Sequence, residues 1–178
     1  MITGTARFQE PPHGGHMSAF LRIGSATGLL ALIIASPIRA QNNQAREAAV
    51  VATLQKLFDG MRSRDAAAMR SVFDPSAKLI NAATRDGQTT IRAIAIDDFV
   101  NSIMSAPADA QLIERIYSPE VRIDGNLATF WAFYTFHLGE QFSHCGVDTA
   151  QLFETSEGWK IVSLADTRRR EGCDPPKN

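Results

Sequence analysis

The sequence has few of the residues that usually build compact metal or redox centres. Among its 178 residues, two are cysteine, two are tryptophan and two are tyrosine, and the formal net charge is −1. Two cysteines that are not spaced as C-x-x-C exclude a cysteine-type zinc site. The near-neutral charge argues against a nucleic-acid partner, which would need a basic face.

Short catalytic motifs are missing as well. The chain contains no G-x-x-x-x-G-K-[ST], no G-x-G-x-x-G after a predicted strand, no H-E-x-x-H and no G-x-S-x-G. Nucleotide-driven, zinc-protease and serine-hydrolase chemistry are therefore excluded as interpretations. No local spacing of histidines such as H-x-x-x-H supports a metal site, so we expect neither a metal nor a cofactor.

Long apolar runs are also missing, except for one near the start. Residues 23–35 are mainly apolar, follow Arg22 and lead into the small and aliphatic residues of Ser36-Pro37-Ile38-Arg39-Ala40. This order is typical of a secretory signal peptide that is cleaved after Ala40. A membrane span would need roughly 20 apolar residues. We therefore expect residues 1–40 to be a signal peptide, with Met17 as the true start, and the protein to be exported, periplasmic or secreted, without membrane contact after cleavage.

The remaining chain is long enough for one domain with its own hydrophobic core. Three arginines and one glutamate fall in the first 40 residues, which leaves the rest with a net charge of about −3. We expect a single domain over 41–174 and a frayed tail at 175–178. In an oxidising compartment, Cys145 and Cys173 would form one disulfide, and two free thiols are the alternative.

The hydrophobic pattern predicts an α+β fold. Amphipathic periodicity predicts helices over 45–61 and 66–72 and a third that begins at Asp97. Alternation predicts strands at 77–84, 89–95, 111–123, 127–138, 142–155 and 159–168, with Asp86-Gly87 as a hairpin turn between the first two. Helices packed on one face of a curved antiparallel sheet account for this order.

One predicted strand carries apolar residues on both faces. Phe130, Trp131, Phe133, Tyr134 and Phe136 all lie within residues 127–138. Neither face of such a strand can be exposed to water at little cost. We expect one face to cover the helices and the other to contact a second subunit, which predicts a homodimer with Tyr134 in its interface.

These elements resemble the nuclear transport factor 2-like (NTF2-like) superfamily, which includes SnoaL-like polyketide cyclases and ketosteroid isomerase. The resemblance covers residues 44–171 and rests on Phe73-Asp74-Pro75, on Gly158-Trp159-Lys160-Ile161 and on the element order. Ser143-His144-Cys145-Gly146-Val147-Asp148 is similar to exported bacterial lumazine-binding-like members. The resemblance implies a cone-shaped fold, but enzymes, ligand-binding proteins and interaction modules share that fold. The base and oxyanion-hole trio of the isomerase has no matching motif here, so isomerase activity is not implied.

Strand alternation predicts the lining of the cone. If residues 127–138 turn tightly into 142–155, four residues of the first strand share a face with His144 and Asp148 of the second. A shift of one residue in the pairing would separate the two sets. Ser163 continues this face on the last strand, and Asn81 would lie at the mouth. The four residues of the first strand are Trp131, Phe133, Thr135 and His137.

Three functions are compatible with this lining. The leading hypothesis is an exported domain that binds a small, largely apolar molecule in an aromatic-lined cone. The second is a cofactor-free isomerase, dehydratase or hydrolase in which Asp148 orients His137 as a general base. The third is a structural or interaction module, in which the aromatic strand serves only the core and the dimer.

Overall fold

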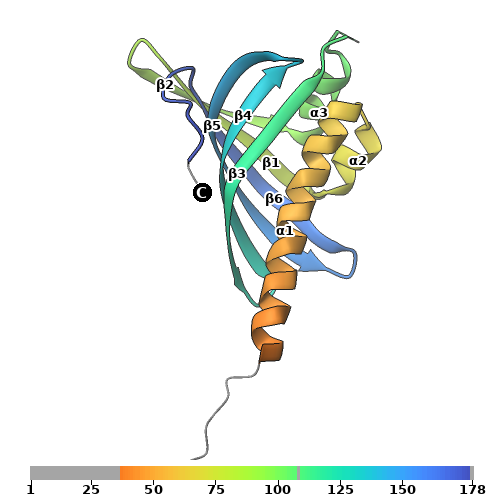
Figure 1. Ribbon diagram of the computed structural model, residues 1–178. Coiled ribbons are helices and arrows are strands. Elements are labelled where there is room, and N and C mark those ends of the chain that lie inside the picture. Colours follow the sequence, from red (N-terminus) through yellow and green to blue (C-terminus); the bar gives the residue numbers. More distant parts are fainter. Residues whose placement is uncertain (1–36, 108, 177–178) are drawn as a thin grey trace, which may run out of the picture. The chain divides into compact units, whose positions relative to one another are not determined.

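The protein is described by a computed structural model that covers residues 37–107 and 109–176 (Figure 1). Met17 and most of the expected signal peptide lie outside the described residues. Residues from Ser36 onward form one compact unit, and the following description concerns that unit.

Three helices cover one face of the sheet. They are α1 (Pro37–Ser63), α2 (Ala66–Ser71) and α3 (Ile96–Met104). The α1 side chains Val50, Leu54 and Leu57 recur at helical spacing and are fully buried, so one stripe of α1 faces the core. Asp65 begins α2 by accepting a hydrogen bond from the Ala68 amide at 2.9 Å. None of the described helices is long and apolar enough to cross a membrane.

Six strands form one open, mixed sheet. They are β1 (Phe73–Arg85), β2 (Gln88–Ala95), β3 (Leu112–Asp124), β4 (Leu127–Leu138), β5 (Gln141–Thr155) and β6 (Gly158–Arg168). The order across the sheet is β2-β1-β6-β5-β4-β3, and the β1–β6 pair alone is parallel among the described strands. At the β1–β2 turn, Asp86 and Gly87 have φ angles of 53° and 75°. This left-handed pair is the geometry that the Asp-Gly signal predicts.

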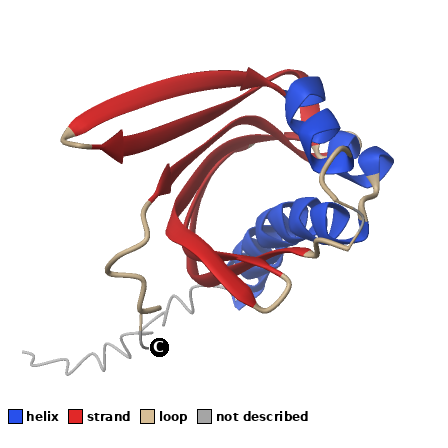
Figure 2. Cartoon of the chain, turned by 90° about the horizontal axis from the view of Figure 1, so that it is seen from above, coloured by secondary structure: helices blue, strands red, loops and turns tan. Residues whose placement is uncertain are grey.

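The sheet curves around the helices, which lie on its concave side (Figure 2). The core fills the space between them and includes Phe130, Leu152 and Ile161, each at most 1 % exposed. The predicted α+β fold, with N-terminal helices packed on a curved and mainly antiparallel sheet, is confirmed. Six strands and three helices occur close to the predicted positions, although α1 begins earlier, at Pro37, and β1 begins earlier, at Phe73.

The predicted disulfide is present. Cys145 on β5 is bonded to Cys173, with 5.6 Å between the two Cα atoms. The Cys145 amide also donates to the Arg169 carbonyl, and the Arg169 amide donates back, both at 2.9 Å. The segment that follows β6 is therefore held against β5 by a covalent bond and by two backbone hydrogen bonds.

The predicted pairing of β4 with β5 is wrong beyond the first two residue pairs. The turn pairs Leu138 with Gln141 and His137 with Phe142, as a tight hairpin would, but the next pair is Phe136 with His144. Ser143 is therefore an extra residue, a β-bulge that shifts all later β5 residues by one place relative to β4. As a result, Asp148 shares a face with Ala132 instead of Trp131.

Candidate functional site

A cavity of about 290 Å³ lies between the helices and the concave face of the sheet. One wall is apolar and is formed by α1, α3 and the end of β4. Its main side chains are Leu57, Phe58, Met61, Phe99, Ile103 and Phe136. The polar wall comes from β1, β3, β4, β5 and β6, and it adjoins the apolar wall at Phe136, which pairs with Glu114 and with His144. We call the residues Asn81, Glu114, Tyr134, His144, Asp148, Asp166 and Arg168 the polar wall.

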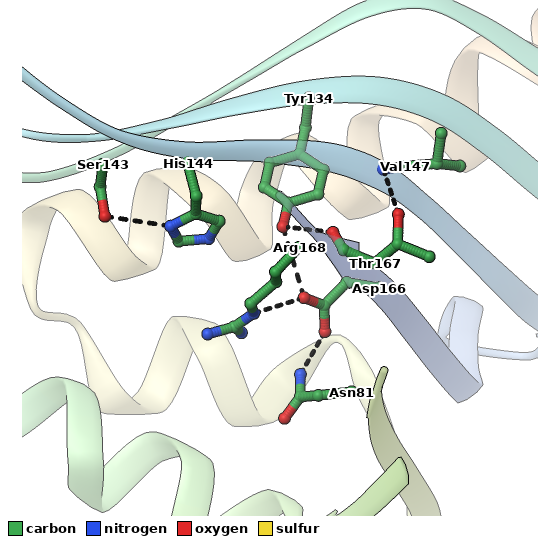
Figure 3. Close-up of polar contacts among 8 residues, drawn as sticks. All are labelled: Asn81, Tyr134, Ser143, His144, Val147, Asp166, Thr167 and Arg168. Carbon is green, nitrogen blue, oxygen red and sulfur yellow. Dashed lines mark hydrogen bonds and ion pairs between the residues drawn. The ribbon is translucent and has the colours of Figure 1, made fainter. Parts of the chain in front are cut away.

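Asp166 joins three other side chains of the polar wall (Figure 3). One oxygen of Asp166 accepts a hydrogen bond from the Asn81 amide group, and the other accepts from Arg168 Nε at 2.6 Å. The Tyr134 hydroxyl donates to the Thr167 carbonyl at 2.9 Å and lies 3.4 Å from Asp166 Oδ2. Asp166 therefore has its charge balanced by Arg168, and Tyr134 has its proton directed at the backbone.

Glu114 on β3 and Asp148 on β5 form a second polar group, a hydrogen-bonded pair of carboxyls. Burial raises the pKa of Glu114 to about 7, because desolvation disfavours the charged form. Asp148 is only 3 % exposed, and burial together with the adjacent Glu114 charge raises its pKa well above the usual range. The half-buried Glu114 and the buried Asp148 thus retain a proton between them at a pH where exposed carboxyls are ionised.

His144 is also uncharged at neutral pH. Burial and the nearby Arg168 lower the pKa of His144 to about 4. The ring centroids of His144 and Phe136 are 5.0 Å apart, and Ser143 Oγ lies 3.0 Å from His144 Nδ1. The Tyr134 hydroxyl is likewise kept protonated, because burial and the charges of Asp166 and Asp148 raise its pKa.

Gly146 allows the Tyr134 ring to lie against β5. A Cβ atom at position 146 would stand 1.8 Å from the Thr167 carbonyl oxygen and 2.9 Å from the Tyr134 ring. These distances leave no room for a side chain. The lack of a side chain at Gly146 therefore brings Tyr134 and Thr167 close enough to form their hydrogen bond.

The structure brings His144 and two of the predicted site residues into the cavity and leaves the other predicted residues outside it. Asp148 and Asn81 line the cavity. His137 and Thr135 line a separate groove on the outer face of the sheet, and Trp131 lines another. Phe133 packs against Tyr117 with 6.0 Å between ring centroids. The predicted face shared by His137 and Asp148 is therefore wrong, and the cause is the bulge at Ser143.

Two further placements differ from the predictions. Tyr134, expected in a subunit interface, is 2 % exposed and belongs to the polar wall. Ser163 does not line the cavity, because a second irregularity pairs Gln151 with Ser163 but Leu152 with Ile161. Val162 is therefore an extra residue on β6. It turns Ser163 away from the cavity and places Leu164 there instead. Within the described residues, no three His, Cys, Asp or Glu side chains are grouped in a way that could hold a metal ion.

Sequence reasoning missed the acidic residues of β3 and β6. Asp166 follows Val162-Ser163-Leu164-Ala165, so its carboxyl interrupts a mainly apolar stretch, whereas Glu114 precedes Arg115 in a strand with several other charged residues. A charged residue inside a mainly apolar stretch is costly unless it has a partner. That signal was available for Asp166, but pairing Glu114 with Asp148 required knowledge of the strand order.

The pH dependence of stability should change when Glu114 is replaced by glutamine. The folded protein releases the Glu114 proton near pH 7, and the unfolded chain releases it near pH 4.5. Stability therefore falls as the pH rises between these values and stays low above them. We expect Glu114→Gln to raise the free energy of unfolding at pH 8 by about 2 kcal/mol, and by much less at pH 5. Urea unfolding at both pH values measures this difference.

Glu120→Gln is the matched control, because Glu120 lines an outer groove and lies away from the cavity. In the control variant, the difference between the free energies of unfolding at pH 5 and pH 8 should be the same as in the wild type. A Glu114→Gln variant that shifts stability equally at pH 5 and pH 8 would contradict a raised pKa for Glu114.

Comparison with known proteins places the chain in a family. Residues 45–165 match the family model described as "putative lumazine-binding". No match was found among functionally curated proteins.

Solved structures share the fold at low sequence identity. A Mycobacterium tuberculosis protein of unknown function is 13% identical, with a TM-score of 0.60 over 82% of this chain and 83% of that one. An NTF2-like protein with a cystatin-like fold from Novosphingobium aromaticivorans is 12% identical, with a TM-score of 0.58 over 76% and 89% of the two chains. A structure from Streptomyces avermitilis titled a putative dehydratase of the NTF2-like family is 13% identical, with a TM-score of 0.54 over 71% and 98%. The chain belongs to the putative lumazine-binding family, and its fold is that of solved structures described as NTF2-like.

Proposed function

We propose that this domain binds a small, largely apolar molecule in the cavity between its helices and its sheet. The observation that carries the proposal is the division of a cavity of about 290 Å³ into an apolar wall and a polar wall. Ligand sites are typically concave and mainly apolar, with a few polar groups that fix orientation. The lumazine-binding description of the family points in the same direction.

Binding of 2-phenylethanol, an uncharged probe with one ring and one hydroxyl, tests this function. We expect its NMR chemical-shift changes to be concentrated at the cavity lining. Ser102 lines the cavity from α3, so the larger side chain of Ser102→Trp should occupy part of the cavity and weaken binding about tenfold or more. Gln151→Trp adds the same side chain at an exposed β5 position outside the cavity and is the control. Equal binding by both variants would contradict a ligand site in the cavity.

A second candidate function is a cofactor-free proton-transfer enzyme, such as an isomerase or a dehydratase. The specific observation is the pKa of Glu114, raised to about 7 by burial, since a general base works best near the ambient pH. Glu114 replaces His137 as the candidate base, because His137 lies on the outer face. Turnover of a substrate, once one is found, should be lost in Glu114→Gln and kept in His137→Ala.

We also propose that the protein is exported, periplasmic or secreted. The disulfide between Cys145 and Cys173 fits an oxidising compartment. The leader-like composition of residues 1–40 supports the same location. The mass of the secreted protein should correspond to a chain that begins at Gln41, and an intact Met1 would contradict cleavage.

We further propose a homodimer that forms through the outer face of the sheet. Trp131 is 53% exposed there, and Leu127 and Phe153, which pair with each other on the same face, are also exposed. Large apolar side chains grouped on a surface are typical of subunit contacts. We expect sedimentation equilibrium to show a dimer, and Trp131→Glu to convert it to a monomer. The control Ile91→Glu changes an exposed residue of β2 and should stay dimeric. A wild-type protein that remains monomeric at high concentration would contradict the proposal.

A further inference from the structure

The carboxyls that line the cavity outnumber its basic groups, even though the Glu114–Asp148 pair retains a proton. Four lining carboxyls, those of Asp98, Glu114, Asp148 and Asp166, face one lining guanidinium, that of Arg168. Arg168 is bonded to Asp166 at 2.6 Å, so its charge is already compensated. Among the described residues, no lysine or arginine lies within ion-pair distance of Glu114 or Asp148. The carboxyl pair is thus the part of the polar wall without a cation.

One atom of this pair lacks any hydrogen-bond partner. Asp148 Oδ2 is buried and has none among the described residues, although the side chain lines the cavity. A buried acceptor without a donor is costly, and most such atoms in folded proteins are satisfied. A ligand that brings an N–H group to Asp148 would remove that cost.

The other groups of the polar wall do not favour a ligand that only accepts hydrogen bonds. The Tyr134 proton is already donated to the Thr167 carbonyl at 2.9 Å, and the Asn81 amide is donated to Asp166. An anionic ligand would be repelled by the excess of carboxyls. The groups left for a ligand are therefore mainly acceptors.

The apolar wall suits the rest of such a ligand. Phe58 and Phe99 line the cavity from α1 and α3, and Phe136 lines it from β4, beside Glu114. Aromatic faces attract organic cations as well as apolar groups. An ammonium group attached to a small apolar body would match both walls.

We propose that the ligand of this cavity is a small apolar amine, whose protonated nitrogen binds the Glu114–Asp148 carboxyl pair while its apolar part contacts the phenylalanines of the apolar wall. The inference rests on the proposed function, because it names the chemical class of the molecule that the cavity binds.

Three probes of one shape test the inference: 2-phenylethylamine, 2-phenylethanol and phenylacetate. They share a phenyl ring and differ in charge at the polar end. At pH 7.5, we expect NMR titration to show that the amine binds about tenfold or more tightly than the alcohol, and the carboxylate most weakly. The Glu114→Gln/Asp148→Asn double variant should bind the amine no more tightly than the alcohol. Its affinity for the alcohol should stay within about twofold of the wild-type affinity. If the double variant does not fold, the same comparison of amine and alcohol is made with Glu114→Gln alone.

The control and the outcomes separate this inference from the proposed function. Glu120→Gln removes a carboxylate outside the cavity and should leave the order of the three probes unchanged. If the alcohol or the carboxylate binds as tightly as the amine, the amine preference is wrong while the cavity remains a ligand site. If none of the three binds, both the inference and the proposed function are contradicted.

Discussion

Gly146→Ala should be the most damaging single substitution in the sheet. The new methyl group would stand 1.8 Å from the Thr167 carbonyl oxygen, and a backbone atom within a sheet cannot rotate away as a flexible side chain can. Relief requires β6 to move from β5, which would break the 2.9 Å hydrogen bond from Tyr134 to Thr167. We expect a loss of about 4 kcal/mol or more in the free energy of unfolding, a size reached only by severe steric or packing defects. Urea unfolding measures it.

Gly125→Ala is the control for loss of glycine as such. Gly125 has a φ angle of 56°, and a Cβ atom there would meet nothing within 4 Å. Only the left-handed backbone conformation is penalised at this turn, at about 1–2 kcal/mol. If the two variants are destabilised equally, the close approach of β6 to Gly146 is not the cause.

Reduction of the disulfide should have the second largest effect. Cys145 and Cys173 are 28 residues apart, and the chain-entropy model assigns roughly 3 to 4 kcal/mol to a cross-link that closes a loop of this length. We expect dithiothreitol to lower the free energy of unfolding of the wild type by this amount. Reduction changes no side-chain volume, so the measurement isolates the cross-link.

The Cys145→Ala/Cys173→Ala variant provides the matched control. Cys145 is fully buried, so the variant also loses some packing and should be less stable than the reduced wild type. Its unfolding should not respond to dithiothreitol. An oxidised wild type that unfolds at the same urea concentration as the reduced protein would show that the covalent bond contributes nothing to stability.

Most of the fold could be predicted from local patterns. Helical periodicity in α1, the Asp65 cap of α2 and the Asp86-Gly87 turn are short-range signals, and each appears where it was expected. Element boundaries were less certain. The start of β1 at Phe73 depends on its pairing with Ile161 of β6, a contact made with a distant part of the chain.

The site was predicted less well, because its composition depends on single-residue shifts in strand pairing. The extra residue Ser143 in β5 exchanged the inner and outer faces of β4 relative to Asp148. An irregularity on β6 had the same consequence for Ser163. Alternation gives the two sets of residues on a strand but not which set faces the helices. No local signal in the sequence distinguished Tyr134 from Trp131 in this respect.

The position of β6 between β1 and β5 has a consequence for the order of folding. The polar wall joins Asn81 on β1 to Asp166 on β6, the last strand of the chain, across a parallel pair that only β6 can complete. Such distant pairings form late and slowly compared with hairpins. During synthesis, β1 and β2 can form their hairpin, and β3, β4 and β5 can form theirs, as two separate sheets. They become one sheet, with the cavity beside it, only after residue 168 has emerged from the ribosome.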